Sequence, residues 1–152
     1  MVLYTASAIM SFYDKLEEQS ARFYENLAAN EKYSEGREVF LAFATEDEKH
    51  KEMVLRTYRE VITDAYEAGF SFTGLHESDY RTNTELTEDL SYSDILRRAF
   101  EIEEKIYRFC MDVSERSRGL LDDISHVFER VAKRKADRKL RLESLREKRQ
   151  LG

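Results

Sequence analysis

The sequence contains no proline, only five glycines and a single cysteine among its 152 residues. Proline and glycine are the residues that most weaken helix interiors, so their scarcity favours long, uninterrupted helices. Cys110 cannot form a disulfide within the chain, which is typical of a reducing compartment. No apolar run approaches the length of a membrane span, and the first residues lack a basic stretch followed by an apolar one. We therefore expect a cytoplasmic protein.

Charged residues make up 37% of the chain, and the formal net charge is -6. This balance argues against nucleic acid as the main ligand, because binding to phosphates requires a basic surface. The charge is unevenly distributed, however, since 133–149 is strongly basic and 77–89 is acidic. We interpret the basic segment as a solvated helix face, with contact to RNA or to an acidic protein partner as the alternative.

Apolar residues recur with the 3.6-residue period of a helix in four segments. The first covers about 6–30 and the second about 34–68, with Ser34 as a possible cap and Gly69 as the stop. The third begins after Ser91 or Ser93, and the fourth covers about 120–149. The outer joints are short and the middle one, 69–93, is long, which predicts two antiparallel helical hairpins joined by a crossover. We expect an all-α four-helix bundle with one domain over 1–152.

Polar residues interrupt each apolar stripe near its middle. Helical spacing places six of them on inner faces: Glu17, Asp47, His50, Glu103, Lys135 and Arg138. Several buried charges at one level are tolerated only if they neutralise one another or bind a metal. The two halves also repeat, since LEEQSARFYENLA (16–28) and IEEKIYRFCMDVS (102–114) each place a glutamate six residues before a phenylalanine. The repeat predicts that the polar residues of the two hairpins face one another.

With FATEDEKHKEM (43–53) and AFEIEEKIYRF (99–109), these segments resemble the ferritin-like di-iron carboxylate proteins, rubrerythrins in particular. That family takes one Glu from each of two helices and a Glu-x-x-His pair from each of the other two. The resemblance implies that Glu17 and Glu103 are the single glutamates. It also implies that Asp47 and His50 form one pair, with Asp in place of Glu.

The second pair of the family pattern is missing. Lys135 stands where Glu is expected and Arg138 where His is expected, and neither side chain is a metal ligand at neutral pH. The one cysteine also excludes a Cys₄ iron site of the rubredoxin type within this chain. The resemblance further implies association into a dimer.

Three hypotheses about the centre remain open. In the first, Lys135 and Arg138 replace the metals electrostatically and leave a metal-free network of buried salt bridges. In the second, Glu17, Asp47, His50 and Glu103 hold one Fe, Mn or Zn ion. In the third, the chain is an active di-iron oxidoreductase of the peroxidase or ferroxidase type.

Other residues suggest no separate site. His76 and His126 lack partners at ligand spacing and are expected on the surface. Cys110 is expected to be a small core residue. Tyr24, Tyr58 and Tyr107 lie near the polar layer, where we expect them to donate hydrogen bonds to buried carboxylates.

Overall fold

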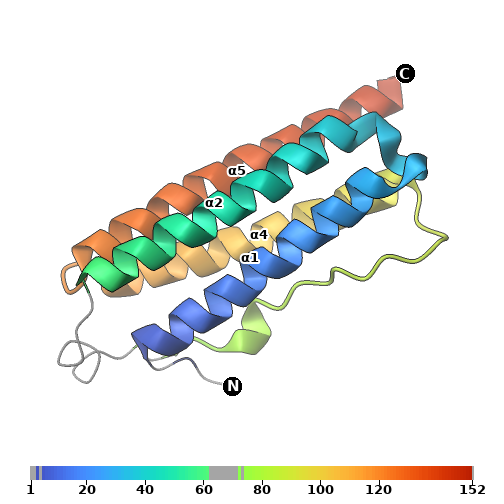
Figure 1. Cartoon of the computed structure of the whole chain (residues 1–152). Helices are drawn as coiled ribbons and strands as arrows, with labels where there is room; N and C mark the ends of the chain where they lie inside the picture. Colours follow the sequence, from blue (N-terminus) through green and yellow to red (C-terminus); the bar gives the residue numbers. More distant parts are fainter. Residues whose placement is uncertain (1–2, 4, 62–71, 73, 152) are drawn as a thin grey trace.

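The computed structural model describes residues 3, 5–61, 72 and 74–151 (Figure 1). Four long helices dominate it: α1 (Ala6–Ala29), α2 (Arg37–Val61), α4 (Tyr92–Ser117) and α5 (Asp122–Leu151). Two short 3-10 helices accompany them, η1 (Glu31–Gly36) and η2 (Glu77–Asp79). The expected all-α bundle is confirmed. No helix of the described residues is long and apolar enough to cross a membrane.

The helices pack as two hairpins, with α1 against α2 and α4 against α5. The hairpins meet where α2 packs on α5 and α1 on α4, so α1 and α5 lie diagonally across the bundle (Figure 1). The crossover returns along the outside of α1 and α4, which is the ferritin-like connectivity (Figure 1). The expected end of the second helix, near residues 68 and 69, lies outside the described residues.

The turn between α1 and α2 differs from the prediction that a helix starts near Ser34. Asn30 accepts a hydrogen bond from the Lys32 backbone N–H at 2.9 Å and begins η1, which contains Ser34. The α-helix itself starts at Arg37. Gly36 permits this tight entry, because a Cβ there would lie 2.7 Å from the Phe40 ring.

The start of α4 agrees with the sequence. Ser91 accepts a hydrogen bond from the Asp94 N–H, and the Asp94 carboxylate accepts one from the Ser91 N–H, each at 3.0 Å. This reciprocal capping box satisfies two backbone donors that a helix start otherwise leaves unpaired. It fixes the point at which the crossover ends and the second hairpin begins.

The crossover is attached to the core by an aromatic residue. Tyr80 is buried, its ring packs edge-on against Phe109 at 5.2 Å, and its phenol donates to Asp112 at 2.5 Å. Phe109 in turn stacks on Phe12 of α1 at 5.3 Å and packs edge-on against Phe128 of α5 at 6.3 Å. These rings fill the bundle on one side of the polar level and hold its four helices in register.

Candidate functional site

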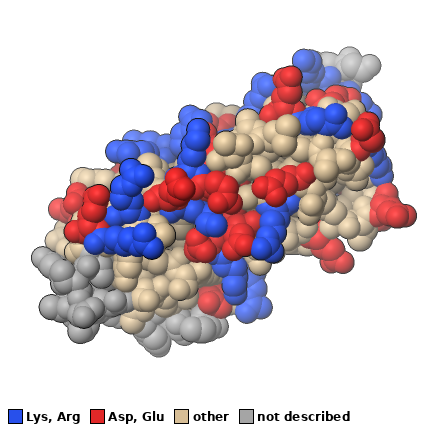
Figure 2. Space-filling view, in the orientation of Figure 1, with Lys and Arg blue, Asp and Glu red and all other residues tan. Residues whose placement is uncertain are grey.

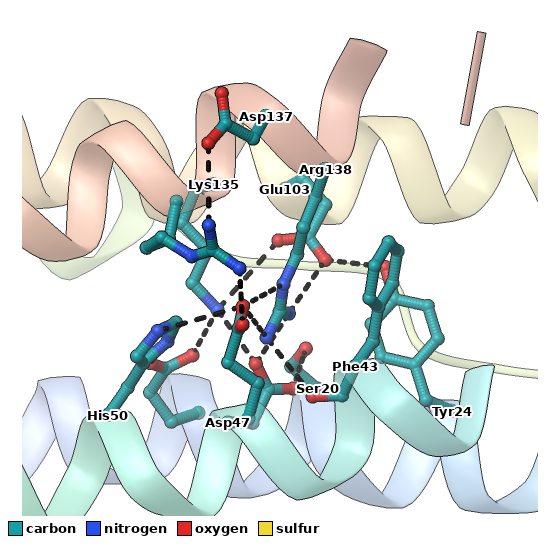
Figure 3. Close-up of polar contacts among 12 residues, drawn as sticks. Ser20, Tyr24, Phe43, Asp47, His50, Glu103, Lys135, Asp137 and Arg138 are labelled. Carbon is teal, nitrogen blue, oxygen red and sulfur yellow. Dashed lines mark hydrogen bonds and ion pairs between the residues drawn. The ribbon is translucent and has the colours of Figure 1, made fainter. Parts of the chain in front are cut away.

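The six inner-face residues predicted from the sequence meet at one level inside the bundle (Figure 3). Every helix contributes, and all six side chains are buried. The spacing explains the convergence, because residues three apart on α2 and on α5 lie on the same helix face. The expectation that the two hairpins place their polar residues opposite one another is therefore confirmed.

Lys135 lies at the centre of this level. Its ammonium donates to Glu17 Oε1 at 2.6 Å and to Asp47 Oδ1 at 2.8 Å, and it lies 3.8 Å from Glu103 Oε1. All four side chains are fully buried, with 0% exposure. One cation thus contacts carboxylates from three other helices.

Arg138 provides the second buried cation. Its Nη1 donates to Asp47 Oδ1 at 2.6 Å and to Glu103 Oε2 at 3.2 Å, while Nη2 donates to the Phe43 carbonyl at 3.1 Å. The guanidinium also lies 4.6 Å from the centre of the Phe43 ring and donates through Nε to Glu46 at 3.1 Å. The planar fork of Arg138 therefore joins α5 to both α2 and α4.

Three hydroxyl groups complete the pairing of the carboxylates. Tyr13 donates to Glu17 at 2.6 Å, and Tyr24 donates to Glu103 at 2.5 Å. Ser20 donates to Asp47 Oδ2 at 2.7 Å (Figure 3). Each buried carboxylate thus accepts a bond from one hydroxyl and interacts with at least one cation.

Sequence analysis predicted the role of Tyr24 but missed those of Tyr13 and Ser20. Both lie one helical turn from Glu17, at positions four before and three after it, and this spacing could have identified them. Tyr107, expected near the same level, instead lies beneath the ammonium of Lys139, 4.5 Å from its ring centre.

Glu46 was also not predicted, because its side chain reaches the level from the edge. It accepts bonds from buried Arg138 and from exposed Arg134, the latter at 2.7 Å. His50 lies between this edge and the centre, with Nε2 3.7 Å from Glu46 and Nδ1 3.4 Å from Glu17. His50 Nδ1 is buried and makes no hydrogen bond of acceptable geometry.

The charges in this network determine the pKa values of its members. Burial alone would raise the pKa of Glu17, but Lys135, His50 and Arg138 outweigh it and lower the pKa to about 2. Burial raises the pKa of Asp47, against the lowering effect of Lys135. Burial and Arg138 would lower the pKa of Lys135, yet the surrounding carboxylates raise it, so its ammonium form is favoured.

Three of the predicted ligands are close enough to share one metal ion. Glu17, Asp47 and His50 each offer a ligand atom, and these atoms lie within 4.8 Å of one another. Two carboxylates and one imidazole suit Fe(II), Mn(II) or Zn(II). The Lys135 ammonium, however, is bound to both carboxylates, so an ion held by them requires Lys135 to withdraw.

The remaining candidates behave as expected. His76 and His126 are exposed, and neither belongs to a metal-ligand group among the described residues. Cys110 is fully buried, and burial raises the pKa of its thiol well above the ordinary value, so the inert thiol form is favoured.

A four-helix bundle with this crossover, carrying Glu, Asp and His side chains at one internal level, defines a ferritin-like protein. The rubrerythrin family model matches residues 14–133, and the chain belongs to that family. The match ends before Lys135, so it does not reach the two cations of α5. No curated protein and no solved structure matches the chain.

Proposed function

We propose that this chain is a metal-free member of the rubrerythrin family, in which Lys135 and Arg138 take the place of the metal ions. Its bundle then acts through its surfaces, as a binding module, and has no di-iron redox activity. The contact of the Lys135 ammonium with both Glu17 and Asp47, at 2.6 and 2.8 Å, carries this proposal.

Charge balance supports it. Three fully buried carboxylates face two buried cations, which leaves a residual charge near -1. Buried carboxylates without counter-charge are costly, and in a di-metal centre the metal ions supply that counter-charge. Here α5 supplies it, because both of its inward polar side chains are cationic. The hydroxyls of Tyr13, Ser20 and Tyr24 use carboxylate lone pairs that a metal ion would otherwise take.

A second candidate function is the binding of one Fe, Mn or Zn ion by Glu17, Asp47 and His50, with Glu103 as a fourth ligand. The buried Nδ1 of His50, which has no hydrogen bond, favours this candidate. A bound ion would act as a Lewis acid at this level. Repulsion by Arg138 and displacement of Lys135 both oppose it, so we rank it below the metal-free centre.

Metal content distinguishes these functions. The chain would be expressed with added Fe, Mn and Zn, purified without a metal-affinity tag, and measured for metal per chain by mass spectrometry. Less than about 0.1 metal per chain in a helical protein supports the proposal, since that occupancy implies very weak binding. About one per chain, lost in Asp47→Ala and His50→Ala but retained in the exposed control His126→Ala, would establish the second candidate.

About two metals per chain would overturn the proposal. It would show that a di-iron oxidoreductase, the third hypothesis, tolerates Lys135 and Arg138. Oxidase and peroxidase activity would then be measured on the iron-loaded protein. A metal-free protein with neither activity is the result that we expect.

A further inference from the structure

The acidic side chains of the crossover have no cationic partners. Segment 77–89 contains five carboxylates and one arginine. In the described part of the chain, none of these carboxylates lies within 4 Å of a cationic group, and all but Glu77 belong to exposed residues. The cations that do reach the crossover bind backbone carbonyls instead: Lys32 binds that of Glu88, Lys105 that of Asp79, and Arg98 that of Glu85.

The C-terminal half of α5 carries the opposite excess. Arg141, Arg146 and Lys148 form no ion pair with any described residue, whereas the neighbouring Arg149 is bound to Glu35 at 2.6 Å. Nε of Arg146 is buried and lacks a hydrogen-bond partner. Beside them lies a hollow of about 400 Å³, lined by Glu35, Tyr92, Leu145, Lys148 and Arg149. This end of α5 therefore offers a basic, partly apolar concave surface.

Both surfaces lie at the end of the bundle where α1 stops and α4 begins (Figure 1). The helix η1 separates them, because its Lys32 touches the crossover and its Glu35 holds the end of α5. In Figure 2, Lys and Arg side chains follow the upper edge, over α5, while Asp and Glu side chains project at the right, where the crossover turns. The two surfaces cannot pair within one molecule without displacing η1.

We propose that a second copy of this chain binds here, with the acidic crossover of each copy seated on the basic end of α5 in the other. Because both surfaces flank one end of the bundle, a two-fold axis through that end makes both contacts at once and closes the assembly as a dimer. The inference is independent of the metal-free centre, since none of the residues involved lies at the buried level.

The occupant fits the surface chemically. Residues 85–89 read ELTED, and among the described residues their only backbone–backbone hydrogen bond is accepted by Thr87 from Leu90. Their carboxylates and free backbone groups are available to Arg141, Arg146 and Lys148, and the half-buried Leu86 can turn toward the hollow. Charge complementarity of this kind speeds association and fixes register, and it weakens as salt screens it.

The test measures the mass of the whole chain in solution, by sedimentation and light scattering, at about 0.1 M and about 1 M salt, where the Debye length is ~10 and ~3 Å. We expect a dimer at low salt that dissociates at high salt. Arg141→Glu/Lys148→Glu and Glu85→Lys/Glu88→Lys should each weaken dimerisation at least ~10-fold, because each turns attraction into repulsion.

Mixing the two variants provides the decisive arm. The reversed α5 end of one then faces the reversed crossover of the other, so the mixed dimer should form again at low salt. Arg56→Glu/Arg59→Glu makes the same charge change on exposed arginines of α2 without printed contacts to either surface, and it should leave dimerisation unchanged. Helicity by circular dichroism confirms that each variant is folded.

Two results would overturn the inference. One is a monomer at about 100 μM and low salt, a concentration at which a micromolar Kd would populate a dimer. If that monomer bound a single-stranded oligonucleotide through Arg141 and Lys148, the basic surface would belong to nucleic acid instead. The other is a dimer whose stability neither charge reversal changes.

Discussion

Lys135 donates a 2.6 Å hydrogen bond to Glu17, and this contact joins α5 to α1, the two helices that lie diagonally across the bundle. Diagonal helices do not pack directly, so only a long side chain or a shared ion can connect them. In a ferritin-like di-metal centre, the ions make this connection between inward-facing side chains. Here a lysine makes it, and the charged level of the bundle depends on that residue.

Replacement of Lys135 by Met should strongly destabilise the fold. The change keeps the length of the side chain but removes the ammonium, leaving Glu17 and Asp47 buried with reduced counter-charge. Breaking one partner of a buried ion pair costs about 3–5 kcal/mol. Denaturant unfolding at pH 7 measures the loss. Lys133→Met, at an exposed position two residues away, should cost less than ~1 kcal/mol, and equal losses in the two variants would contradict the structural role.

Restoring the missing ligand pair on α5 should create metal binding. The double variant Lys135→Glu/Arg138→His places Glu-x-x-His on the inner face of α5, opposite Asp47 and His50. It removes both internal cations and adds a carboxylate, so metal ions must then supply the counter-charge. We expect about two metals per chain by mass spectrometry and a thermal midpoint that rises on addition of metal.

The matched control places the same two residues outside the core. Lys133→Glu/Ala136→His creates the same spacing one helix face away, where neither Glu17 nor Asp47 can contribute, and it should gain no metal. A restored variant that folds but stays metal-free would show that more than the two α5 positions separates this chain from a metal-binding bundle.

Acid should remove the stabilisation that the network derives from Glu17. A carboxyl group whose pKa is lowered by folding stabilises the protein above its unfolded pKa, and that contribution is lost as the pH falls to the folded pKa. For Glu17 the window lies between its ordinary pKa of 4.5 and about 2. Asp47, whose pKa is raised, acts in the opposite direction and reduces the slope.

The measurement is the free energy of unfolding in urea at several pH values between 6 and 3. Wild type should lose on the order of 1–2 kcal/mol more than Glu17→Gln over this range, because one pKa unit corresponds to ~1.4 kcal/mol and the window is only partly crossed. The comparison uses slopes, so the lower stability of the variant at pH 6 does not affect it. Parallel slopes would show that Glu17 is not held ionised by Lys135.

The fold was largely predictable because its determinants are local or periodic. Apolar periodicity located all four helices, the Ser91 cap located the start of α4, and the length of the middle joint gave the crossover. The start of α2 was misplaced because η1 has helical periodicity without α-helical bonding. Asn30 and the contact of Gly36 with Phe40 set that boundary, and the second depends on tertiary packing.

The candidate site was predicted in membership but not in connectivity. Helical spacing placed Lys135 and Arg138 on the inner face, yet it could not show that both donate to the same oxygen of Asp47, since side-chain conformations in a crowded core are set jointly. Glu46 escaped prediction because it reaches Arg138 from the edge of the stripe. Residues that combine an exposed position with a buried partner give no periodic pattern.

The Tyr24 phenol should contribute more to stability than an equivalent phenol at the edge of the bundle. Tyr24 donates to the fully buried Glu103, whereas Tyr80 donates to the half-exposed Asp112, each at 2.5 Å. Tyr24→Phe should cost about 1.5–3 kcal/mol in denaturant unfolding, the range for hydrogen bonds to charged groups. Tyr80→Phe should cost roughly 1 kcal/mol or less, because water can replace the lost donor at Asp112. If the two losses were equal, or if Tyr24→Phe were neutral, Glu103 would have to be neutralised by Arg138 alone.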